Sequence, residues 1–264
     1  MRGTKRLEGV RHKIAVMSGK GGVGKSTIAA NLALALAMHG SRTGLLDCDM
    51  HGPTIPRILG IGGERPSADG GVIRPITVGE GLRVMSIGLL LDSRDSPVIW
   101  RGPLKMKAIE QLLGDVQWGE LDYLVIDLPP GTGDEPLSVV QLVPNIDGAV
   151  VVTTPQDVAL LTVRRAIRFA EKVKLPVIGL IENMSGFICP HCGGRIDIFR
   201  SGGGERLASE MGIRFLGRVP LDPSIVESGE DGRPFVLGSG KSAKIFKDIV
   251  NQIEKYLGEK GGAM

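Results

Sequence analysis

A glycine-rich segment near the N-terminus has the residue types and spacing of a phosphate-binding loop. It fits the pattern G-x-x-x-x-G-K-[ST] and consists of Gly19, Lys20, Gly21, Gly22, Val23, Gly24, Lys25, Ser26 and Thr27. Glycines let backbone N–H groups turn inward around phosphate oxygens, and a helix starting here directs its positive end at the same anion. We expect Lys25 to reach the β- and γ-phosphates and the Ser26 hydroxyl to coordinate Mg²⁺. Lys20 is an additional cation for a phosphate in its own site or in a neighbouring subunit's site; the alternative is a solvated loop lysine.

Three aspartates that follow apolar runs supply the oxygen ligands that Mg²⁺ prefers. Asp127 ends the run Tyr123–Asp127, and we expect it to hold Mg²⁺ through water. Asp47 is a second candidate for this outer shell. Asp49 could face the γ-phosphate and position the attacking water, because phosphoryl transfer depends mostly on positioning and charge neutralisation. The alternative role for Asp47 and Asp49 is the capping of a helix or turn.

Cys189 and Cys192 form a C-x-x-C pair that can share one metal ion or one face of a cluster. A closed site for zinc or for an iron–sulfur cluster usually needs four ligands, and this pair supplies two. A symmetric homodimer would bring two pairs together and complete the set. The shared group could be a bridging cluster or a structural zinc, and a redox dithiol is the remaining alternative. We expect Cys48 to be a small buried residue and His191 to be an exposed loop histidine.

Short apolar runs alternate with helical patterns, which predicts a parallel sheet covered by helices on both faces. The strands expected from these runs are Lys13–Ser18, Thr43–Asp49, Tyr123–Asp127, Ala149–Thr154, Val177–Asn183 and Phe215–Val219. The expected helices are Ser26–Met38, Leu104–Leu113 and Val158–Val173, and a hairpin is expected around Gly79–Gly81. Ligands in such folds bind at the carboxyl ends of strands, where the glycine loop and the three aspartates fall. The predicted fold is an α/β P-loop NTPase with a mostly parallel, twisted sheet.

The length of 264 residues, without a linker, repeat or low-complexity segment, indicates a single domain over residues 1–264. Within it we expect a lead-in at residues 1–12 and a mobile tail at residues 258–264. The segment before the tail predicts a helix with one apolar face, made of Ile245, Phe246, Ile249, Val250, Ile253 and Leu257. Its polar face carries charges of both signs, so we expect it to dock on the body rather than on a membrane.

Composition and charge exclude several classes of function. Apolar residues at 42% and charged residues at 23% argue against a largely disordered chain. A net charge of +3 is too small to indicate nucleic-acid binding, and 4% aromatic residues offer few stacking surfaces for single strands. The charged N-terminus has no apolar signal region, and the longest apolar run, Ile28–Met38, is too short to cross a bilayer. We therefore expect a cytoplasmic protein without a nucleic-acid or membrane partner.

Several segments together resemble one known family. The glycine loop with Lys20 resembles the deviant Walker A motif of the MinD/ParA/nitrogenase-iron-protein group. Within that group, Asp47–Pro56, Asp127–Asp134 and Glu182–Gly194 are similar to the switch I, the Walker B with switch II, and the cysteine motif of Mrp-type (ApbC/Nbp) iron–sulfur carrier ATPases. The resemblance runs from about Lys13 to Val236.

This resemblance implies ATP-dependent dimerisation, with Lys20 reaching the partner's nucleotide. It also implies that Asn183 and the turn formed by Pro220 and Asp222 hold the adenine, and it favours a [4Fe–4S] cluster bridging the cysteine pairs, with zinc as a substitute. The expected function is slow ATP hydrolysis by a homodimer that delivers clusters to apo iron–sulfur proteins. Two alternatives remain open: a ParA/MinD-like positioning switch, and an ATPase with a structural zinc at the cysteine pair.

Overall fold

The computed structural model describes residues 5–50, 52–90, 102–189, 191–192 and 194–261. Within these residues an eight-stranded sheet has the strand order β12–β9–β8–β1–β7–β2–β6–β5. Its strands are β1 (Val10–Ser18), β2 (Thr43–Asp47), β5 (Ile76–Val78), β6 (Leu82–Ser86), β7 (Leu121–Asp127), β8 (Gly148–Thr153), β9 (Val177–Glu182) and β12 (Phe215–Arg218). Every pairing in this sheet is parallel except that of β5 with β6.

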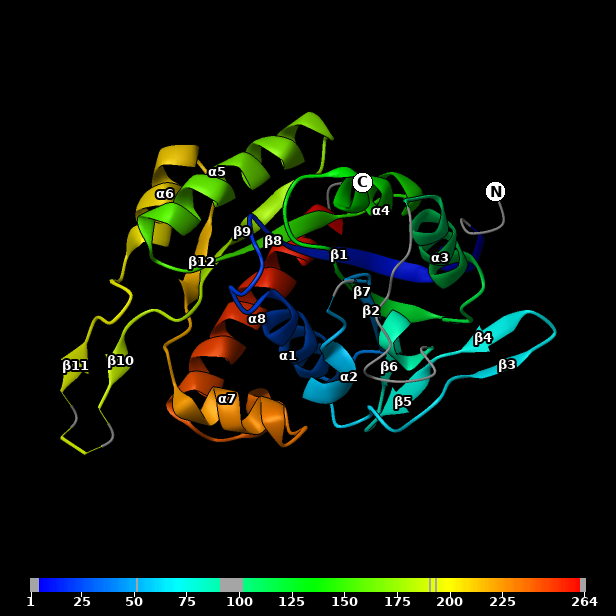
Figure 1. The fold of residues 1–264 in the computed structure, drawn as a ribbon, viewed down its shortest axis with the longest axis horizontal. Helices are drawn as coiled ribbons and strands as arrows, with labels where there is room; N and C mark the ends of the chain where they lie inside the picture. The colour runs from blue at the N-terminus through cyan, green and yellow to red at the C-terminus, as the bar shows by residue number, and fades with distance from the viewer. Residues whose placement is uncertain (1–4, 51, 91–101, 190, 193, 262–264) are drawn as a thin grey trace.

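Helices cover both faces of the sheet, as Figure 1 shows. One face carries α1 (Lys25–Met38), α2 (Ile55–Ile58), α7 (Pro223–Glu230), η3 (Phe235–Leu237) and α8 (Lys241–Gly261). The other face carries η1 (Lys5–Leu7), α3 (Gly102–Gly114), α4 (Asp134–Leu142), α5 (Asp157–Lys172) and α6 (Gly203–Met211). The short η2 (Ile87–Leu89) follows β6. The predicted fold class, a mostly parallel sheet covered on both faces, is confirmed.

The central strand β1 shows why its sequence is apolar without interruption. Ile14 and Val16 belong to the hydrophobic core on the α1 side, and Ala15 and Met17 belong to the core on the α5 side. Successive side chains of a strand point to opposite faces, so a strand buried on both faces needs apolar residues at every position. The strand begins at Val10, which pairs with Leu121, and therefore takes in residues that we expected in the lead-in at 1–12. Residues 1–4 of that lead-in lie outside the described residues.

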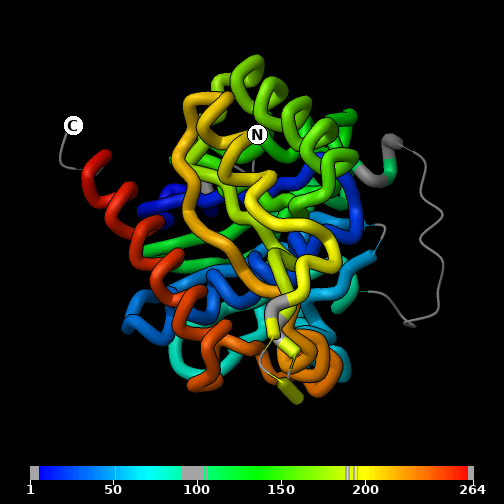
Figure 2. The backbone as a smooth tube through the Cα atoms, turned by 90° about the vertical axis from the view of Figure 1, so that its left-hand side faces the viewer, coloured from blue at the N-terminus to red at the C-terminus, as the bar shows by residue number. Residues whose placement is uncertain are grey.

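The hairpin expected around Gly79–Gly81 is confirmed as the antiparallel pair β5–β6 at the edge of the main sheet. Among the described residues, two more small hairpins lie outside that sheet. A further pair, β3 (Ser67–Asp69) with β4 (Val72–Arg74), was not predicted and is largely exposed. The third pair, β10 (Phe187–Ile188) with β11 (Arg195–Ile196), carries the cysteines. Figure 1 shows this pair at the left edge of the molecule, beyond the main sheet, and in Figure 2 it lies in front of α7.

The C-terminal helix α8 docks on the body, as its apolar face predicts. Phe246, Ile249, Val250, Ile253 and Leu257 are each at most 1% exposed. The helix continues to Gly261 and so includes residues 258–261 of the segment expected to be a mobile tail; residues 262–264 lie outside the described residues. Among the described residues, no helix has the length and apolarity needed to cross a bilayer.

Candidate functional site

The glycine loop of residues 19–24 connects β1 directly to the first turn of α1, the arrangement expected of a phosphate-binding loop. Gly24 precedes α1 with a φ of 84°, and a Cβ placed there would lie 2.2 Å from Nδ2 of Asn183. A Cβ on Gly19 would lie 2.4 Å from the backbone of Thr162 in α5. These two positions therefore require glycine, because neighbouring segments pack directly on the loop. Gly21 has open space around it, so packing does not explain its identity.

Lys25, Ser26 and Asp127 form a hydrogen-bonded group at the start of α1 and the end of β7. Nζ of Lys25 lies 2.7 Å from Oδ1 of Asp127, and the Ser26 hydroxyl donates to Oδ2 of Asp127 over 2.6 Å. Lys25 is 6% exposed and Asp127 is fully buried. The three residues predicted to meet at the phosphate and metal site are therefore brought together.

Burial and neighbouring charges shift the pKa values in this group. Burial raises the pKa of Asp127, and the ion pair and hydrogen bonds with Lys25 and Ser26 only partly offset it. Burial alone would lower the pKa of Lys25, but the charges of Asp127, Asp49 and Asp47 together raise it. The lysine therefore stays positively charged at the place where a phosphate would bind.

Asp47 and Asp49 lie on the same segment but have different surroundings. Asp47 ends β2 in register with Asp127 on β7, and it is fully buried. Its carboxyl accepts hydrogen bonds from the Ser86 hydroxyl (2.8 Å) and from the Asp49 N–H (3.0 Å). Burial, followed by the charge of Asp127, raises the pKa of Asp47 to about 8. Oδ2 of Asp49 lies 3.6 Å from Nζ of Lys25, on the side of the phosphate loop.

The other loop residues have defined places. Lys20 is half-buried, and its carbonyl accepts a hydrogen bond of 2.9 Å from the Ser18 hydroxyl. Val23 is buried, and its carbonyl accepts from Nδ2 of Asn183 over 2.9 Å. Thr27 lies in the first turn of α1 and lines the adjoining pocket. The side-chain amide of Asn183 therefore holds the phosphate loop through the Val23 carbonyl.

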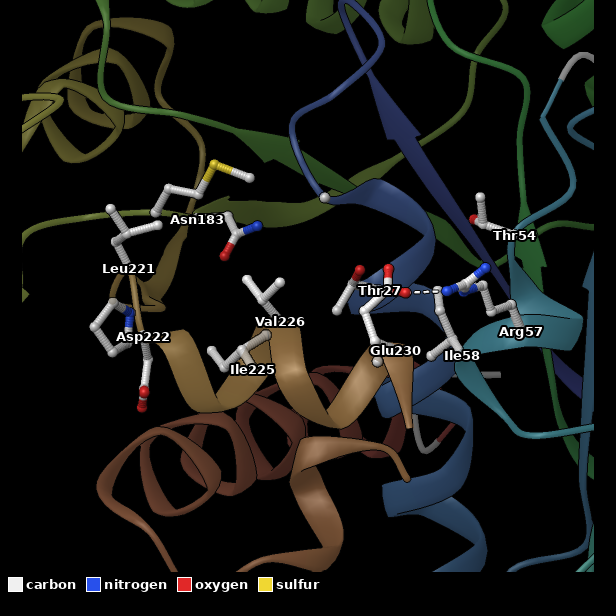
Figure 3. Close-up of a pocket in the computed structure, with 14 residues that line it drawn as sticks. Thr27, Thr54, Arg57, Ile58, Asn183, Leu221, Asp222, Ile225, Val226 and Glu230 are labelled. Carbon is white, nitrogen blue, oxygen red and sulfur yellow. Dashed lines mark hydrogen bonds and ion pairs between the residues drawn. The ribbon is translucent and has the colours of Figure 1, made fainter. Parts of the chain in front are cut away.

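That pocket has a volume of about 290 Å³ and lies beside the phosphate loop (Figure 3). Four segments that are distant in the sequence form its wall: the start of α1, the region of α2, the end of β9, and α7 with the turn before it. The residues that the sequence predicted around adenine, Asn183, Pro220 and Asp222, all line it. Leu221, within the predicted turn, lines it as well; the sequence analysis missed Thr54, Arg57, Ile58, Met184, Ile225, Val226, Gly229 and Glu230.

Asp222 lines the pocket, but its carboxylate is hydrogen-bonded to groups outside the pocket lining. Its carboxylate accepts hydrogen bonds from Ser224 (3.0 Å from the N–H) and from the Ser242 hydroxyl (2.5 Å), and so it caps α7. Although burial opposes them, these hydrogen bonds hold the pKa of Asp222 below its usual value. In Figure 3 the carboxylate points away from Asn183. Its side chain is thus engaged in holding α7, a role signalled by the Asp-Pro start of that helix.

The sequence analysis also missed an ion pair that connects two walls of the pocket. Arg57 of α2 binds Glu230 at the end of α7, and Figure 3 shows this contact beside Ile58. Both side chains are mostly exposed, so the contact contributes little to stability. No local pattern signals it, because the partners are far apart in the sequence.

The cysteine pair lies at the tip of the β10–β11 hairpin. The Cys189 N–H donates to the Gly194 carbonyl over 2.9 Å, which closes the turn. Cys189 is half-buried, and Cys192 and His191 are exposed. Hydrogen bonds from the backbone N–H groups of Cys192 and His191 lower the pKa of the Cys189 thiol, which favours the thiolate form that binds metals.

The two cysteines do not form a complete metal site on one chain. Among the described residues, no group of three or more His, Cys, Asp or Glu side chains is placed to hold a metal ion. Cys48 is fully buried in the core on the α5 side, as expected, and burial raises the pKa of its thiol. Among the described residues, the hairpin therefore offers two thiols and no third ligand beside them.

Comparisons with known proteins agree with this geometry. The sequence model of a family described as NUBPL iron-transfer P-loop NTPase matches residues 9–254. A protein of Methanocaldococcus jannaschii named iron-sulfur cluster carrier protein is 52% identical over 252 residues, which cover 95% of this chain and 87% of the relative.

Solved structures give the same fold. A nucleotide-binding protein from Archaeoglobus fulgidus, described in complex with ADP, is 42% identical with a TM-score of 0.76, over 87% of this chain and 89% of that one. MinD from Pyrococcus horikoshii, described in complex with Mg-ADP, is 24% identical with a TM-score of 0.68, over 95% and 98% of the two chains. The likeness to MinD concerns the fold alone.

Proposed function

The chain belongs to the NUBPL iron-transfer P-loop NTPase family, and from this premise we propose that it is an ATP-hydrolysing carrier that delivers iron–sulfur clusters to apo-proteins. One observation carries the proposal: a single chain combines a phosphate loop at the carboxyl edge of its sheet with an accessible thiol pair on a separate hairpin. The name of the M. jannaschii relative supports the assignment of the cargo. Free thiols of this kind suit a reducing compartment, and we place the protein in the cytoplasm.

The nucleotide is bound by the loop residues 19–27 and by the pocket beside them. Lys25 exchanges its contact with Asp127 for phosphate oxygens, and Lys20 adds charge to the partner's site. Ser26 and Asp127 fit Mg²⁺, because a hydroxyl and a carboxylate oxygen lie 2.6 Å apart there and Mg²⁺ prefers oxygen ligands. When bound, Mg²⁺ neutralises phosphate charge, with Asp47 behind Asp127 as a second outer-shell candidate.

Asp49 is the residue that we assign to turnover. Its carboxylate is 3.6 Å from Nζ of Lys25, so it lies beside the phosphates that the lysine contacts. From there it positions the attacking water, and the reaction is slow because the protein supplies positioning rather than a strong base. Asn183 and the backbone of Pro220 and Asp222 hold the adenine.

The cluster is the cargo and is held between two chains. Each chain supplies Cys189 and Cys192, and two copies related by a two-fold axis supply the four thiolates of a [4Fe–4S] cluster. An exposed, shared site suits a carrier, since it can be opened to release what it holds. Nucleotide-dependent movement of the segments after Asp47 and Asp127 shifts the subunit contact and thereby controls release.

The test is the content of iron and acid-labile sulfide per dimer after anaerobic reconstitution, with zinc measured in the same samples. About four irons and four sulfides per dimer would support the bridging cluster. Transfer to an apo-protein, followed by its absorption spectrum with ATP, ADP or no nucleotide, then tests delivery. Little iron with one firmly bound zinc per dimer would instead make the cysteines a structural clasp of an ATP-driven switch.

A positioning switch that binds membranes is disfavoured by the C-terminal helix. The apolar face of α8 is buried against the body and is not available to a lipid surface. Sedimentation with liposomes or DNA in the presence of ATP separates this alternative, because a cluster carrier would stay in the supernatant in both mixtures.

A further inference from the structure

Glu182, the last residue of β9, is a fully buried carboxylate that the nucleotide site does not use. Oε1 accepts hydrogen bonds from the Ser185 hydroxyl (2.5 Å) and from the Gly202 N–H (2.9 Å). Oε2 accepts from the Gly204 N–H (2.5 Å), at the start of α6. Nε of Arg218 lies 3.7 Å from Oε1 and balances part of the buried charge. A buried carboxylate is stable only with such partners, so this arrangement is specific.

The partners of Glu182 bracket the cysteine hairpin. Ser185 precedes β10 and Gly202 follows β11, and both donate to the same oxygen of Glu182. The two strands between them pair at Phe187↔Ile196 and Ile188↔Arg195. At its base the first strand also bridges to Leu221, whose N–H donates to the Gly186 carbonyl over 2.9 Å. A two-stranded hairpin of this size is marginally stable alone. The position of the cysteines therefore depends on the contacts at the base of the hairpin.

The residue after Glu182 connects the same base to the phosphate loop. The backbone N–H of Asn183 donates to Thr153 over 2.7 Å, and its side-chain amide donates to the Val23 carbonyl and packs on Gly24. Asn183 also lines the nucleotide pocket. Two consecutive residues thus hold the hairpin on one side and the phosphate loop on the other.

We propose that Glu182 is a positioning residue, which fixes both ends of the cysteine hairpin on the nucleotide-binding body and transmits nucleotide binding to it through Asn183. The proposal deepens the proposed function and rests on it only in assigning the cysteines to metal. It does not require a cluster for its main test, because the hairpin can be observed directly.

The main test is amide hydrogen exchange in the peptides that carry β10 and β11, compared between the wild type and Glu182→Gln. Glutamine keeps the shape but removes the charge and turns one acceptor into a donor. We expect exchange in these peptides to be about tenfold faster or more, as the loss of a hydrogen bond to a charged group predicts. Glu205→Gln is the matched control: Glu205 also binds Arg218, but it is exposed and lies in α6 rather than at the end of β9.

A second measurement separates positioning from a general structural role. ADP should slow exchange in the hairpin of the wild type, and Glu182→Gln should abolish this effect while ADP still binds with affinity within about threefold, because coupling and binding are separate free energies. Cobalt(II) titrated onto the cysteines, followed by thiolate-to-cobalt absorption, should bind more weakly in Glu182→Gln than in Glu205→Gln.

The outcomes are distinct. Hairpin exchange and an ADP response equal to those of Glu205→Gln would overturn the proposal. If Glu182→Gln does not fold, Ser185→Ala removes one of the two end contacts and should give a smaller increase in exchange, and no increase would again overturn it. Failure of the wild type to bind iron would contradict the cluster-carrier function and leave the exchange result standing.

Discussion

The carboxyl edge of the sheet and the cysteine hairpin are built in opposite ways. At the sheet edge, Lys25 and Asp127 are almost completely buried and bonded to each other. On the hairpin, Cys192 is exposed, and the strands that carry the pair share two residue pairs. Phosphoryl transfer needs charges in fixed positions, which a buried network supplies. A site that releases its ligand to another protein has to be accessible to that protein, and a short, exposed hairpin is sufficient to carry such a site.

The largest effect is expected from Cys189→Ala. The variant should lose metal binding at the hairpin by at least about a hundredfold, because even changes outside the ligand shell commonly cost ten- to hundredfold. ADP affinity should change little, because neither cysteine lines the pocket. Iron analysis after reconstitution and ADP titration measure the two. His191→Ala, on the same turn, is the control; equal loss of iron in both variants would show that the turn and not the thiol is what matters.

The largest effect on stability is expected in the packed body of the protein. Phe246→Ala should lower the free energy of unfolding by about 3–5 kcal/mol, because it opens a cavity between α8 and the sheet. Ile196→Ala on the hairpin, where the side chain is 51% exposed, should change it by less than about 0.5 kcal/mol. Urea unfolding monitored by circular dichroism measures both. Similar values for the two variants would contradict the contrast between body and hairpin.

A smaller effect is expected at the nucleotide site from Asp49→Asn. We expect kcat for ATP hydrolysis to fall about a hundredfold with KM almost unchanged, as for a group that acts in the transition state. Asp69→Asn, on the exposed strand β3, is the control and should hydrolyse ATP normally. An increase in KM without a change in kcat would reassign Asp49 to ground-state binding.

The smallest effect is the pH dependence contributed by Asp47. Its pKa in the folded protein, about 8, is above the value in an unfolded chain, so the native state binds the extra proton between those values. Its contribution to stability is therefore complete at low pH and is lost as the pH rises toward 8. Asp47→Asn should gain stability relative to the wild type by roughly 2 kcal/mol between pH 6 and pH 8.

Asp222 is expected to show the opposite dependence of stability on pH. Its pKa is lowered in the folded protein, so its contribution is present at neutral pH and is lost only as the pH falls through that lowered value. Asp222→Asn should thus lose stability at pH 7, with no change between pH 6 and pH 8. Thermal unfolding across this range measures both variants, and parallel profiles would remove Asp47 as a titrating group.

The sequence predicts the parts of the site whose signals are local. The phosphate loop and Asp127 follow apolar strands, and parallel strands end at one edge, so their meeting could be inferred before the contacts were known. The cysteine pair was equally visible. The helix containing Phe246 was predicted from its apolar period, but its continuation past Gly258 was not, because glycine signals a helix end. The added residues make polar contacts with distant segments: Glu259 with Arg214 and Lys260 with the Asp147 carbonyl.

The remaining parts depend on contacts between distant segments. Arg57 and Glu230 meet across the pocket only because α2 and α7 lie on the same face of the sheet. The contacts of Glu182 with Ser185 and Gly202 likewise depend on how the chain returns to the end of β9. A glutamate at the end of an apolar run indicates little by itself, since its partners are defined by tertiary structure.

The position of β1 in the sheet has a consequence for how the chain is made. Val10 is in register with Leu121 on one side, and Ile14 is in register with Gly148 on the other. During synthesis β1 therefore leaves the ribosome well before either neighbour, and at ordinary elongation rates it waits roughly ten seconds for β7. Both of its apolar faces are uncovered in that interval, a condition in which nascent chains aggregate or bind chaperones. The strand that leads into the phosphate loop is thus a part of the newborn chain that needs protection.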